Sequence, residues 1–216
     1  MRWLSVAAVV AALLCGCART VDGAAAAPNT NPTETVLRSA DGFGIQLGKP
    51  TARVALDIFI DPRCSLCARL EMFQGGEIAD DIDSGDLVVT YRFVTSDAAP
   101  TGYSHRVSNA VFLAADADLP AVAVQAFVQQ LYWDADPSRD NRYLADIAAS
   151  ARLPQPVVDR IASGSATVDT AAMNVANRKR LNDIRVDTVP TVYDRRIHAT
   201  VDTADNDWLK RLTGGR

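Results

Sequence analysis

The stretch FIDPRCSLCARLEMF, residues 59–73, leads an apolar strand into two cysteines three positions apart and then into an amphipathic helix. The strand pattern covers residues 52–60, and its β-branched, mostly apolar composition is typical of a central strand that is buried on both faces. Pro62 ends it, because proline has no N–H to donate to a sheet. From Cys64 onward the apolar residues recur at helical spacing, and a Gly-Gly pair at 75–76 is expected to close the helix. The flanking patterns therefore place the CxxC motif at a predicted strand-to-helix junction.

The amino terminus has the pattern of an export signal. Arg2 supplies one positive charge ahead of a predominantly apolar segment at residues 4–14. This length matches the core of a signal peptide and falls short of the roughly 20 residues that span a bilayer. The segment ends in Leu-Cys-Gly-Cys, which resembles the bacterial lipobox, so we expect residues 1–16 to be removed and Cys17 to carry a lipid anchor. The alternative is an ordinary secretory signal with a cleavage site further along the chain.

The segment that follows is expected to be a tether to one folded domain. Residues 18–34 are small, polar and proline-bearing, and they show no periodicity. This composition is typical of a flexible segment, so residues 17–40 are interpreted as a tether. Residues 41–216 are long enough for one well-buried domain. Without its signal the chain has 21 basic and 26 acidic side chains, a formal charge of −5, which argues against nucleic acid as a partner.

Cysteine usage narrows the chemistry of the folded part. Cys15 leaves with the signal and Cys17 is expected to be lipidated, so only Cys64 and Cys67 of the four cysteines remain. A lone pair outside the cytoplasm should be oxidised unless something reduces it. A bridge that closes so short a loop restrains the unfolded chain little, so a structural staple explains the pair poorly. A zinc site needs three or four ligands, and the chain has two histidines on separate elements, so no metal is expected.

In the rest of the chain the predicted secondary structure changes from strands to helices and back to strands. Strand patterns occur at residues 42–48 and 86–94, and an Ala-rich segment with five candidate helices runs from about 104 to 181. Strand signals return at residues 186–202 as two short strands about a turn, and residues 205–212 are expected to form a closing helix. A strand–helix–strand crossover requires parallel strands, and a closing hairpin adds antiparallel ones. The order predicts an α/β fold with a helical insertion.

This order resembles the DsbA-like class of thioredoxin-fold proteins, which are thiol-disulfide oxidoreductases with a helical insertion. The resemblance covers residues 42–212 and depends on the CxxC motif, the helical block and the segment VDTVPTV, whose Val189-Pro190 is similar to the family's cis-proline loop. Asp61 stands three residues before the first cysteine, where the family usually has an acid. The resemblance implies a thioredoxin fold whose helical insertion separates a βαβ half from a ββα half.

The same resemblance assigns roles to the two motifs. Cys64 is expected to exchange with the substrate sulfur and Cys67 to resolve the mixed disulfide. The attacking species is a thiolate, which the start of a helix favours. A cis Pro190 exposes the backbone before it, so Val189 is expected to pair with an extended substrate chain.

Four residues are candidates for tuning the thiolate. Arg63 adds a cation and Ser65 a hydroxyl, whereas Leu66 lacks the charge of the histidine that DsbA has in the CxxC motif. The pair is therefore expected to be a milder oxidant than DsbA. Asp57 lies one residue from the family's usual position for a buried acid, and a shift of one residue in a strand moves a side chain to the opposite face.

Together these patterns predict an envelope thiol-disulfide oxidoreductase that oxidises thiols to disulfides, or isomerises disulfides, in exported proteins. Its only redox group would be the Cys64–Cys67 pair, and its partners would be exported or unfolded polypeptides and a membrane protein that recycles it. Lipid on Cys17 would hold the domain on the extracytoplasmic side of the membrane. Two alternatives stay open: a reductase kept reduced by a membrane donor, and a redox-silent thioredoxin-fold lipoprotein that binds peptides or acts as a chaperone.

Overall fold

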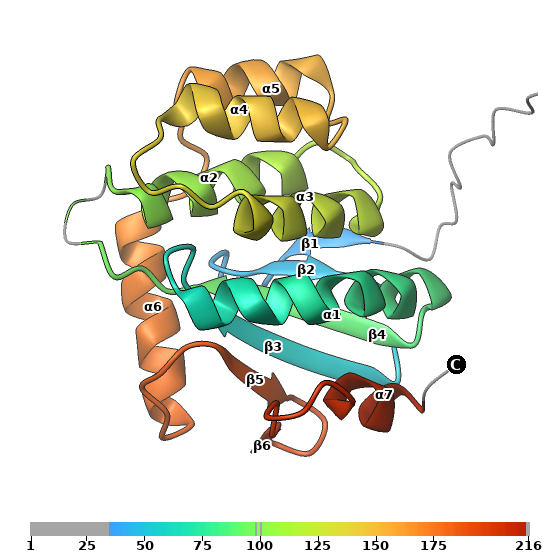
Figure 1. Ribbon diagram of the computed structural model, residues 1–216. Helices are drawn as coiled ribbons and strands as arrows, with labels where there is room; N and C mark the ends of the chain where they lie inside the picture. The colour runs from blue at the N-terminus through green and yellow to red at the C-terminus, as the bar shows by residue number, and fades with distance from the viewer. Residues whose placement is uncertain (1–34, 98, 100, 215–216) are drawn as a thin grey trace, which may run out of the picture. The chain divides into compact units, whose positions relative to one another are not determined.

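A six-stranded sheet forms the centre of the computed structural model, which describes residues 35–97, 99 and 101–214 (Figure 1). The strand order is β1-β2-β4-β3-β5-β6. β3 and β4 are parallel, and the other neighbouring strands are antiparallel. The strands are β1 (Val36–Arg38), β2 (Ile45–Leu47), β3 (Val54–Ile60), β4 (Leu87–Phe93), β5 (Thr191–Asp194) and β6 (Ala199–Thr200).

Every residue of the two central strands, β3 and β4, is buried. Leu56 and Ile58 of β3 belong to the main apolar core, whereas Phe59 packs with Val94 and Leu181 in a separate cluster. Alternate residues of the strand therefore face two different packed layers. This arrangement explains the almost uninterrupted apolar composition of residues 52–60.

Helix α1 (Ser65–Ser84) makes the crossover between β3 and β4, so the predicted strand–helix–strand unit is confirmed. Five helices follow β4, and a last helix follows the β5–β6 hairpin. They are α2 (Tyr103–Ala115), α3 (Ala121–Trp133), α4 (Asn141–Ser150), α5 (Gln155–Ala162), α6 (Thr170–Asp183) and α7 (Trp208–Thr213). The α/β order with a helical insertion is the one expected from the sequence.

The prediction that α1 ends at its Gly-Gly pair is wrong. Gly75 packs against α3, where an added Cβ would lie 2.9 Å from the Gln129 side chain, so this glycine permits close helix packing. Ile78 and Ile82 are fully buried and continue the apolar face of the helix. The helix ends at Gly85, whose φ of 80° is the left-handed conformation common at helix C-termini.

The last residues of the predicted tether belong to the sheet. Val36–Arg38 pairs antiparallel with β2, and the Arg38 guanidinium donates two hydrogen bonds to the Asp116 carboxylate at the end of α2. The same guanidinium lies 5.1 Å from the centroid of the Phe112 ring. Contacts with residues distant in the sequence hold this strand in place. The rest of the expected tether and the signal segment, including Cys17, lie outside the described residues.

The insertion helices pack on both faces of the sheet. α3 lies along α1, as the hydrogen bonds from Gln125 and Gln129 to Glu71 show. α6 packs against the opposite face, where its Leu181 contacts Phe59 of β3. Figure 1 shows α4 and α5 side by side beyond α2 and α3, away from the sheet. The crossover helix therefore lies between the sheet and part of the insertion.

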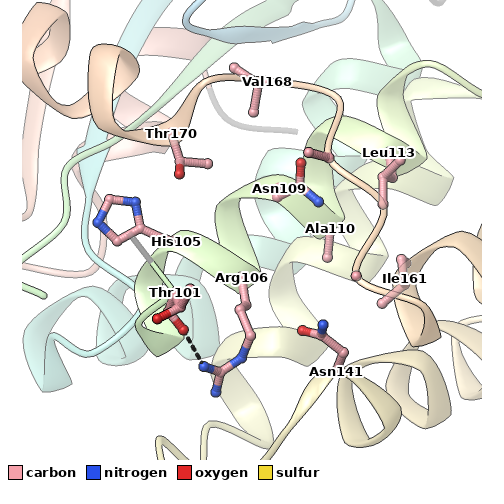
Figure 2. A pocket seen from close by; sticks show the side chains of 12 residues that line it. Thr101, His105, Arg106, Asn109, Ala110, Leu113, Asn141, Ile161, Val168 and Thr170 are labelled. Atoms are coloured by element: carbon pink, nitrogen blue, oxygen red, sulfur yellow. Dashed lines mark hydrogen bonds between the residues drawn. The ribbon is translucent and has the colours of Figure 1, made fainter. Parts of the chain in front are cut away.

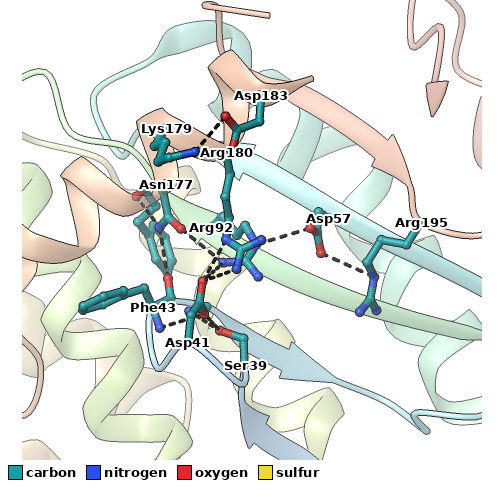
Figure 3. A network of polar contacts seen from close by, with 12 residues as sticks. Ser39, Asp41, Phe43, Asp57, Arg92, Asn177, Lys179, Arg180, Asp183 and Arg195 are labelled. Carbon is teal, nitrogen blue, oxygen red and sulfur yellow. Dashed lines mark hydrogen bonds and ion pairs between the residues drawn. The ribbon is translucent and has the colours of Figure 1, made fainter. Parts of the chain in front are cut away.

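A network of ion pairs joins α6 to the sheet face that lies opposite α1 (Figure 3). Arg92 of β4 is 5% exposed and pairs with Asp41 at 3.1 Å and with Asp57 at 3.3 Å. Arg180 of α6 pairs with Asp41 at 2.7 Å, and Arg195 lies 3.4 Å from Asp57. Burial opposes the ionisation of Asp41, but its hydrogen bonds and the charge of Arg92 hold its pKa well below the usual value.

Removing the central cation of this network is expected to destabilise the fold. Arg92→Leu leaves Asp41 and Asp57 with only partly exposed arginines as ion-pair partners, so the free energy of unfolding should fall by about 2–3 kcal/mol. Denaturant unfolding followed by circular dichroism measures the change. The control Lys179→Ala removes an exposed pair with Asp183 on α6 and should cost less than about 0.5 kcal/mol. Equal costs for the two variants would contradict a central role for Arg92.

Candidate active site

Cys64 occupies the N-cap of α1, directly after the turn that ends β3. The Asp61 carbonyl oxygen accepts a hydrogen bond from the Cys64 N–H at 2.9 Å, and the Asp61 carboxylate accepts one from the Arg63 N–H at 2.9 Å. Cys64 has an extended backbone, with φ −83° and ψ 117°, as N-cap residues do. Its side chain therefore lies at the unpaired N–H groups of the first helical turn.

The Cys64 sulfur lies at the start of α1 and is accessible. The Cys67 N–H donates a hydrogen bond to Cys64 Sγ at 3.3 Å, and the helix start adds its positive end. The side chain is partly exposed, so a substrate sulfur can reach it. Access and stabilisation of the thiolate are the two requirements for a nucleophile in disulfide exchange.

Cys67 has the opposite environment. Its side chain has no exposed surface, and its Sγ accepts one hydrogen bond, from the Asp61 N–H at 3.5 Å. Burial raises the pKa of the Cys67 thiol far above its ordinary value. The buried cysteine therefore keeps its proton until a reaction partner removes it, and both thiols are free in this structure.

The structure brings the downstream proline loop against the first cysteine. The Val189–Pro190 peptide bond is cis, and Cys64 Sγ lies 3.6 Å from the Val189 carbonyl oxygen, to which it donates. The sheet fixes this contact, because β5 begins immediately after Pro190 and pairs with β3, with Thr191 opposite Phe59. Two segments 125 positions apart thus meet in one site.

A groove of about 530 Å³ opens next to this contact. Its walls include Leu66 and Phe73 of α1, Val189 and Pro190 of the loop, and Trp208 of α7. Leu66 and Phe73 are each 58% exposed, although both are large apolar side chains. Exposed apolar side chains around a concave surface indicate a place where another molecule binds.

Three of the candidate tuning residues surround the first turn of α1. Ser65 and Leu66 are exposed there. Arg63 pairs with Asp97, from the loop after β4, at 2.6 Å. Burial opposes the ionisation of Asp97, but a backbone hydrogen bond from the start of α2 and the bond from Arg63 lower its pKa. Arg63 is therefore held in an ion pair with Asp97.

The fourth candidate, Asp57, is not brought to the cysteines. Leu56 and Ile58, its neighbours in β3, share the core cluster that contains Cys67. Asp57 points to the other face of the strand, where it pairs with Arg92 (Figure 3). This is the change of face that a shift of one residue along a strand produces. Asp57 thus belongs to the ion-pair network.

The two histidines lie in separate places. His105 of α2 is buried, with Nε2 3.2 Å from the Thr95 hydroxyl oxygen, and it lines a cavity of about 240 Å³ among the insertion helices (Figure 2). His198 is exposed in the turn between β5 and β6. Within residues 35–97, 99 and 101–214, no group of three or more His, Cys, Asp or Glu side chains could hold a metal ion.

No helix in those ranges is both long and apolar enough to span a bilayer.

The site also contains a buried acid that the sequence analysis missed. Glu71 has no exposed surface and lies one helical turn after Cys67. The Tyr91 hydroxyl donates to Glu71 Oε1 at 2.9 Å, and the Gln125 side-chain amide donates to Oε2 at 3.1 Å. Burial raises the pKa of Glu71 to about 7. Its spacing from Cys67 could have revealed it in the sequence, because a residue four positions after Cys67 lies on the same face of α1.

Comparison with known families identifies the fold. Residues 41–206 match a protein-family model described as Thioredoxin. The chain belongs to this thioredoxin family. The fold class expected from the sequence is therefore confirmed. No curated protein sequence matches the chain closely enough to count as a relative.

Solved structures share the fold of this thioredoxin-family chain. MdbA, a thiol-disulfide oxidoreductase from Corynebacterium diphtheriae, has a TM-score of 0.70 and 21% identity, over 82% of this chain and 93% of MdbA. BdbD from Bacillus subtilis has a TM-score of 0.57 and 17% identity, over 84% and 97% of the two chains. DsbA from Chlamydia trachomatis has a TM-score of 0.59 and 16% identity, over 78% and 89%. The fold is that of DsbA-type proteins.

The two cysteines are expected to react at different rates with an alkylating reagent. In the reduced protein at neutral pH, Cys64 should react with iodoacetamide at least about tenfold faster than Cys67, which is buried and keeps its proton. Peptide fragmentation by mass spectrometry distinguishes the two positions. In guanidinium the rates should converge, which is the control. Equal rates in the folded protein would contradict the different environments assigned to the two thiols.

Proposed function

We propose that this protein is an extracytoplasmic thiol-disulfide oxidoreductase that oxidises dithiols to disulfides, or isomerises disulfides, in exported polypeptides. The observation that carries the proposal is the 3.6 Å contact between Cys64 Sγ and the Val189 carbonyl oxygen, because it joins the CxxC motif to a backbone segment that can bind substrate. Membership of the thioredoxin family and the likeness in fold to a named thiol-disulfide oxidoreductase also support it.

In the oxidising direction, the Cys64–Cys67 disulfide takes two electrons from a substrate dithiol. A substrate thiolate attacks Cys64 Sγ, the bond to Cys67 breaks, and the Cys67 thiolate that leaves takes up a proton. A second substrate thiolate then attacks the first substrate sulfur, a substrate disulfide forms, and Cys64 leaves as a thiolate. Isomerisation starts from the reduced pair: the Cys64 thiolate attacks a substrate disulfide, a mixed disulfide forms and one substrate thiolate leaves. A different substrate thiolate then attacks the substrate sulfur bound to Cys64, a new substrate disulfide forms, and Cys64 leaves as a thiolate.

Substrate binding would use the backbone of Val189 and the groove beside it. The Val189 carbonyl oxygen faces Cys64, and the Val189 N–H has no hydrogen-bond partner among the described residues. An extended peptide can pair with such a segment as an added strand. An apolar substrate side chain near the reacting cysteine would contact Leu66 and Phe73 in the groove.

The surroundings of Cys64 support a milder oxidant than DsbA. Arg63 is paired with Asp97, and Leu66 carries no charge. The thiolate is then favoured mainly by the helix start and the hydrogen bond from Cys67. Strong oxidants of this class owe their potential to a stabilised reduced form, so weaker stabilisation of the thiolate lowers the oxidising power.

The proposal also includes a location and two kinds of partner. The lipobox-like sequence supports a lipid on Cys17, which would hold the domain at the outer side of a membrane. The dithiol left after each substrate is oxidised must be reoxidised before the next cycle. A membrane redox protein is the partner proposed for that step.

Refolding of a reduced protein substrate tests the proposed function. The purified, oxidised protein should speed the recovery of active ribonuclease from its reduced, unfolded form at least about tenfold over glutathione buffer alone, because Cys64 is an accessible electrophile in the disulfide. Cys64→Ser should abolish the acceleration. A wild-type protein that accelerates refolding no more than Cys64→Ser does would contradict the proposal.

Redox-silent peptide binding is a second candidate, favoured by the exposed apolar groove, which does not need the thiols. It predicts that the Cys64→Ser, Cys67→Ser variant still suppresses aggregation of an unfolded polypeptide and that Phe73→Ser weakens this effect. Met72→Ser is the matched control, since Met72 is 43% exposed on the same helix and does not line the groove. Loss of the effect in the double cysteine variant would favour the oxidoreductase.

A further inference from the structure

We propose that the Asp61 backbone N–H stabilises the Cys67 thiolate during disulfide exchange and that Ser104 of the insertion is the positioning residue that holds this donor in place. The inference rests on the proposed oxidoreductase function and deepens it. Burial raises the pKa of the Cys67 thiol far above its ordinary value, and the hydrogen bond from the Asp61 N–H opposes that rise. The reaction nevertheless passes through the thiolate, so a group that stabilises the thiolate affects the rate.

The backbone of Asp61 contacts both cysteines. Its carbonyl oxygen accepts a hydrogen bond from the Cys64 N–H at 2.9 Å, and its own N–H donates to Cys67 Sγ at 3.5 Å. The second contact is buried, since Cys67 has no exposed surface and Asp61 is 5% exposed. Water therefore does not compete with the N–H for the sulfur, and the position of this one residue affects both members of the pair.

The turn after β3 brings Asp61 to this position. Aspartate in the first place and proline in the second favour a β-turn, and Asp61 precedes Pro62. The bond from the Cys64 N–H to the Asp61 carbonyl oxygen closes the turn. Asp61 Oδ1 also accepts a hydrogen bond from the Arg63 N–H at 2.9 Å, as aspartate side chains do in turns. These bonds define the turn, and a contact from the insertion adds to them.

Ser104, in the first turn of α2, supplies that contact. Its hydroxyl donates to Asp61 Oδ1 at 2.6 Å, and the residue has no exposed surface. Its backbone N–H lies at the helix start, where the N–H groups have no partner within the helix, and donates to Asp97 Oδ2 at 2.6 Å. Asp97 Oδ1 accepts a hydrogen bond from the Arg63 side chain at 2.6 Å. Four hydrogen bonds therefore form a closed ring between the turn and the insertion, through Asp61, Arg63, Asp97 and Ser104.

The Asp61 N–H faces the sulfur on which negative charge develops. When a substrate thiolate attacks Cys64 Sγ, the bond to Cys67 breaks, and its electron pair stays on Cys67 Sγ, which then takes up a proton from the solvent. In the reverse direction the Cys67 thiol gives its proton to the solvent, and the thiolate attacks Cys64 Sγ and expels the substrate sulfur as a thiolate. In both directions the N–H donates to a charged sulfur, and a hydrogen bond to the charged form of a group stabilises that form.

The ring orients the donor before the charge appears. A donor that is already in place stabilises a developing charge without a further cost of reorganisation. If the Ser104 hydroxyl were removed, Asp61 Oδ1 would keep the bond from Arg63, which belongs to the same turn and does not tie the turn to the insertion. The hydroxyl acts on the Cys67 sulfur through Asp61, so Ser104 is a positioning residue.

Stopped-flow reaction of the reduced protein with dithionitrobenzoate, an aromatic disulfide with a coloured thiol product, separates the two cysteines. The first release of thiol depends on reagent concentration and reports attack by Cys64, whereas the second is independent of it and reports attack by Cys67 on Cys64 Sγ. Ser104→Ala should slow the second phase at least about threefold and leave the first within about twofold of wild type. A tenfold smaller thiolate fraction is partly offset by higher nucleophilicity, with a Brønsted slope of about 0.4–0.5, so about threefold remains.

Matched variants separate positioning from general loosening. Ser108→Ala removes another buried hydroxyl of α2, which donates to the Ser104 carbonyl oxygen, and should leave both phases unchanged. Asp61→Ala should slow the second phase at least as much as Ser104→Ala does. The combined variant should be no slower than Asp61→Ala, because the hydroxyl acts through that carboxylate. Asp61→Asn keeps an acceptor for the hydroxyl and should recover most of the loss.

The two phases also give the results that would overturn the inference. Equal slowing of both phases in Ser104→Ala, or a second phase as fast as that of Ser108→Ala, would reduce the hydrogen bond to a structural contact. Additive losses in the combined variant would show that Ser104 does not act through Asp61. If Ser104→Ala does not fold, a second phase of wild-type rate in Asp61→Ala overturns the inference by itself. A wild-type protein that shows no second phase would instead contradict the proposed function.

Discussion

The antiparallel pairing of β5 with β3 is the constraint on which the site depends. It sets Thr191 opposite Phe59, so the loop before β5 and the turn after β3 meet at the same end of the sheet. That register places the Val189 carbonyl oxygen 3.6 Å from Cys64 Sγ. A slip of one residue would turn the buried Val192 out of the core. The apolar packing of the sheet therefore fixes the position of a contact that involves no apolar group.

The two cysteines differ because a helix start and a packed core lie one turn apart. Cys64 accepts a hydrogen bond from the first turn of α1, whereas Cys67 points into the layer between α1 and its neighbours. The absence of a side chain at Gly75 lets α3 approach α1 closely. That approach lets the Gln125 side-chain amide of α3 donate a hydrogen bond to the buried Glu71 carboxylate of α1.

The features that could be predicted from the sequence are those with local signals. The CxxC motif follows a strand and opens a helix, so its neighbours in the chain define its setting, and the fold class follows from the order of the elements. Predictions from local signals were wrong where contacts with residues distant in the sequence determine the structure. The Gly-Gly pair resembles a helix stop, but Gly75 packs against α3 within the helix. The short strand before residue 40 depends on the hydrogen bonds from its Arg38 to Asp116. Glu71 became visible only with its partner Gln125, which lies 54 positions away.

The reduction potential of the Cys64–Cys67 pair tests the central claim most directly. The purified protein would be equilibrated in glutathione buffers of defined ratio, and the fraction of free thiols would be read by alkylation and mass spectrometry. A redox-active pair of an oxidase or isomerase should give a value between about −120 and −200 mV. A pair that stays oxidised below about −300 mV would be a structural disulfide and would contradict the account.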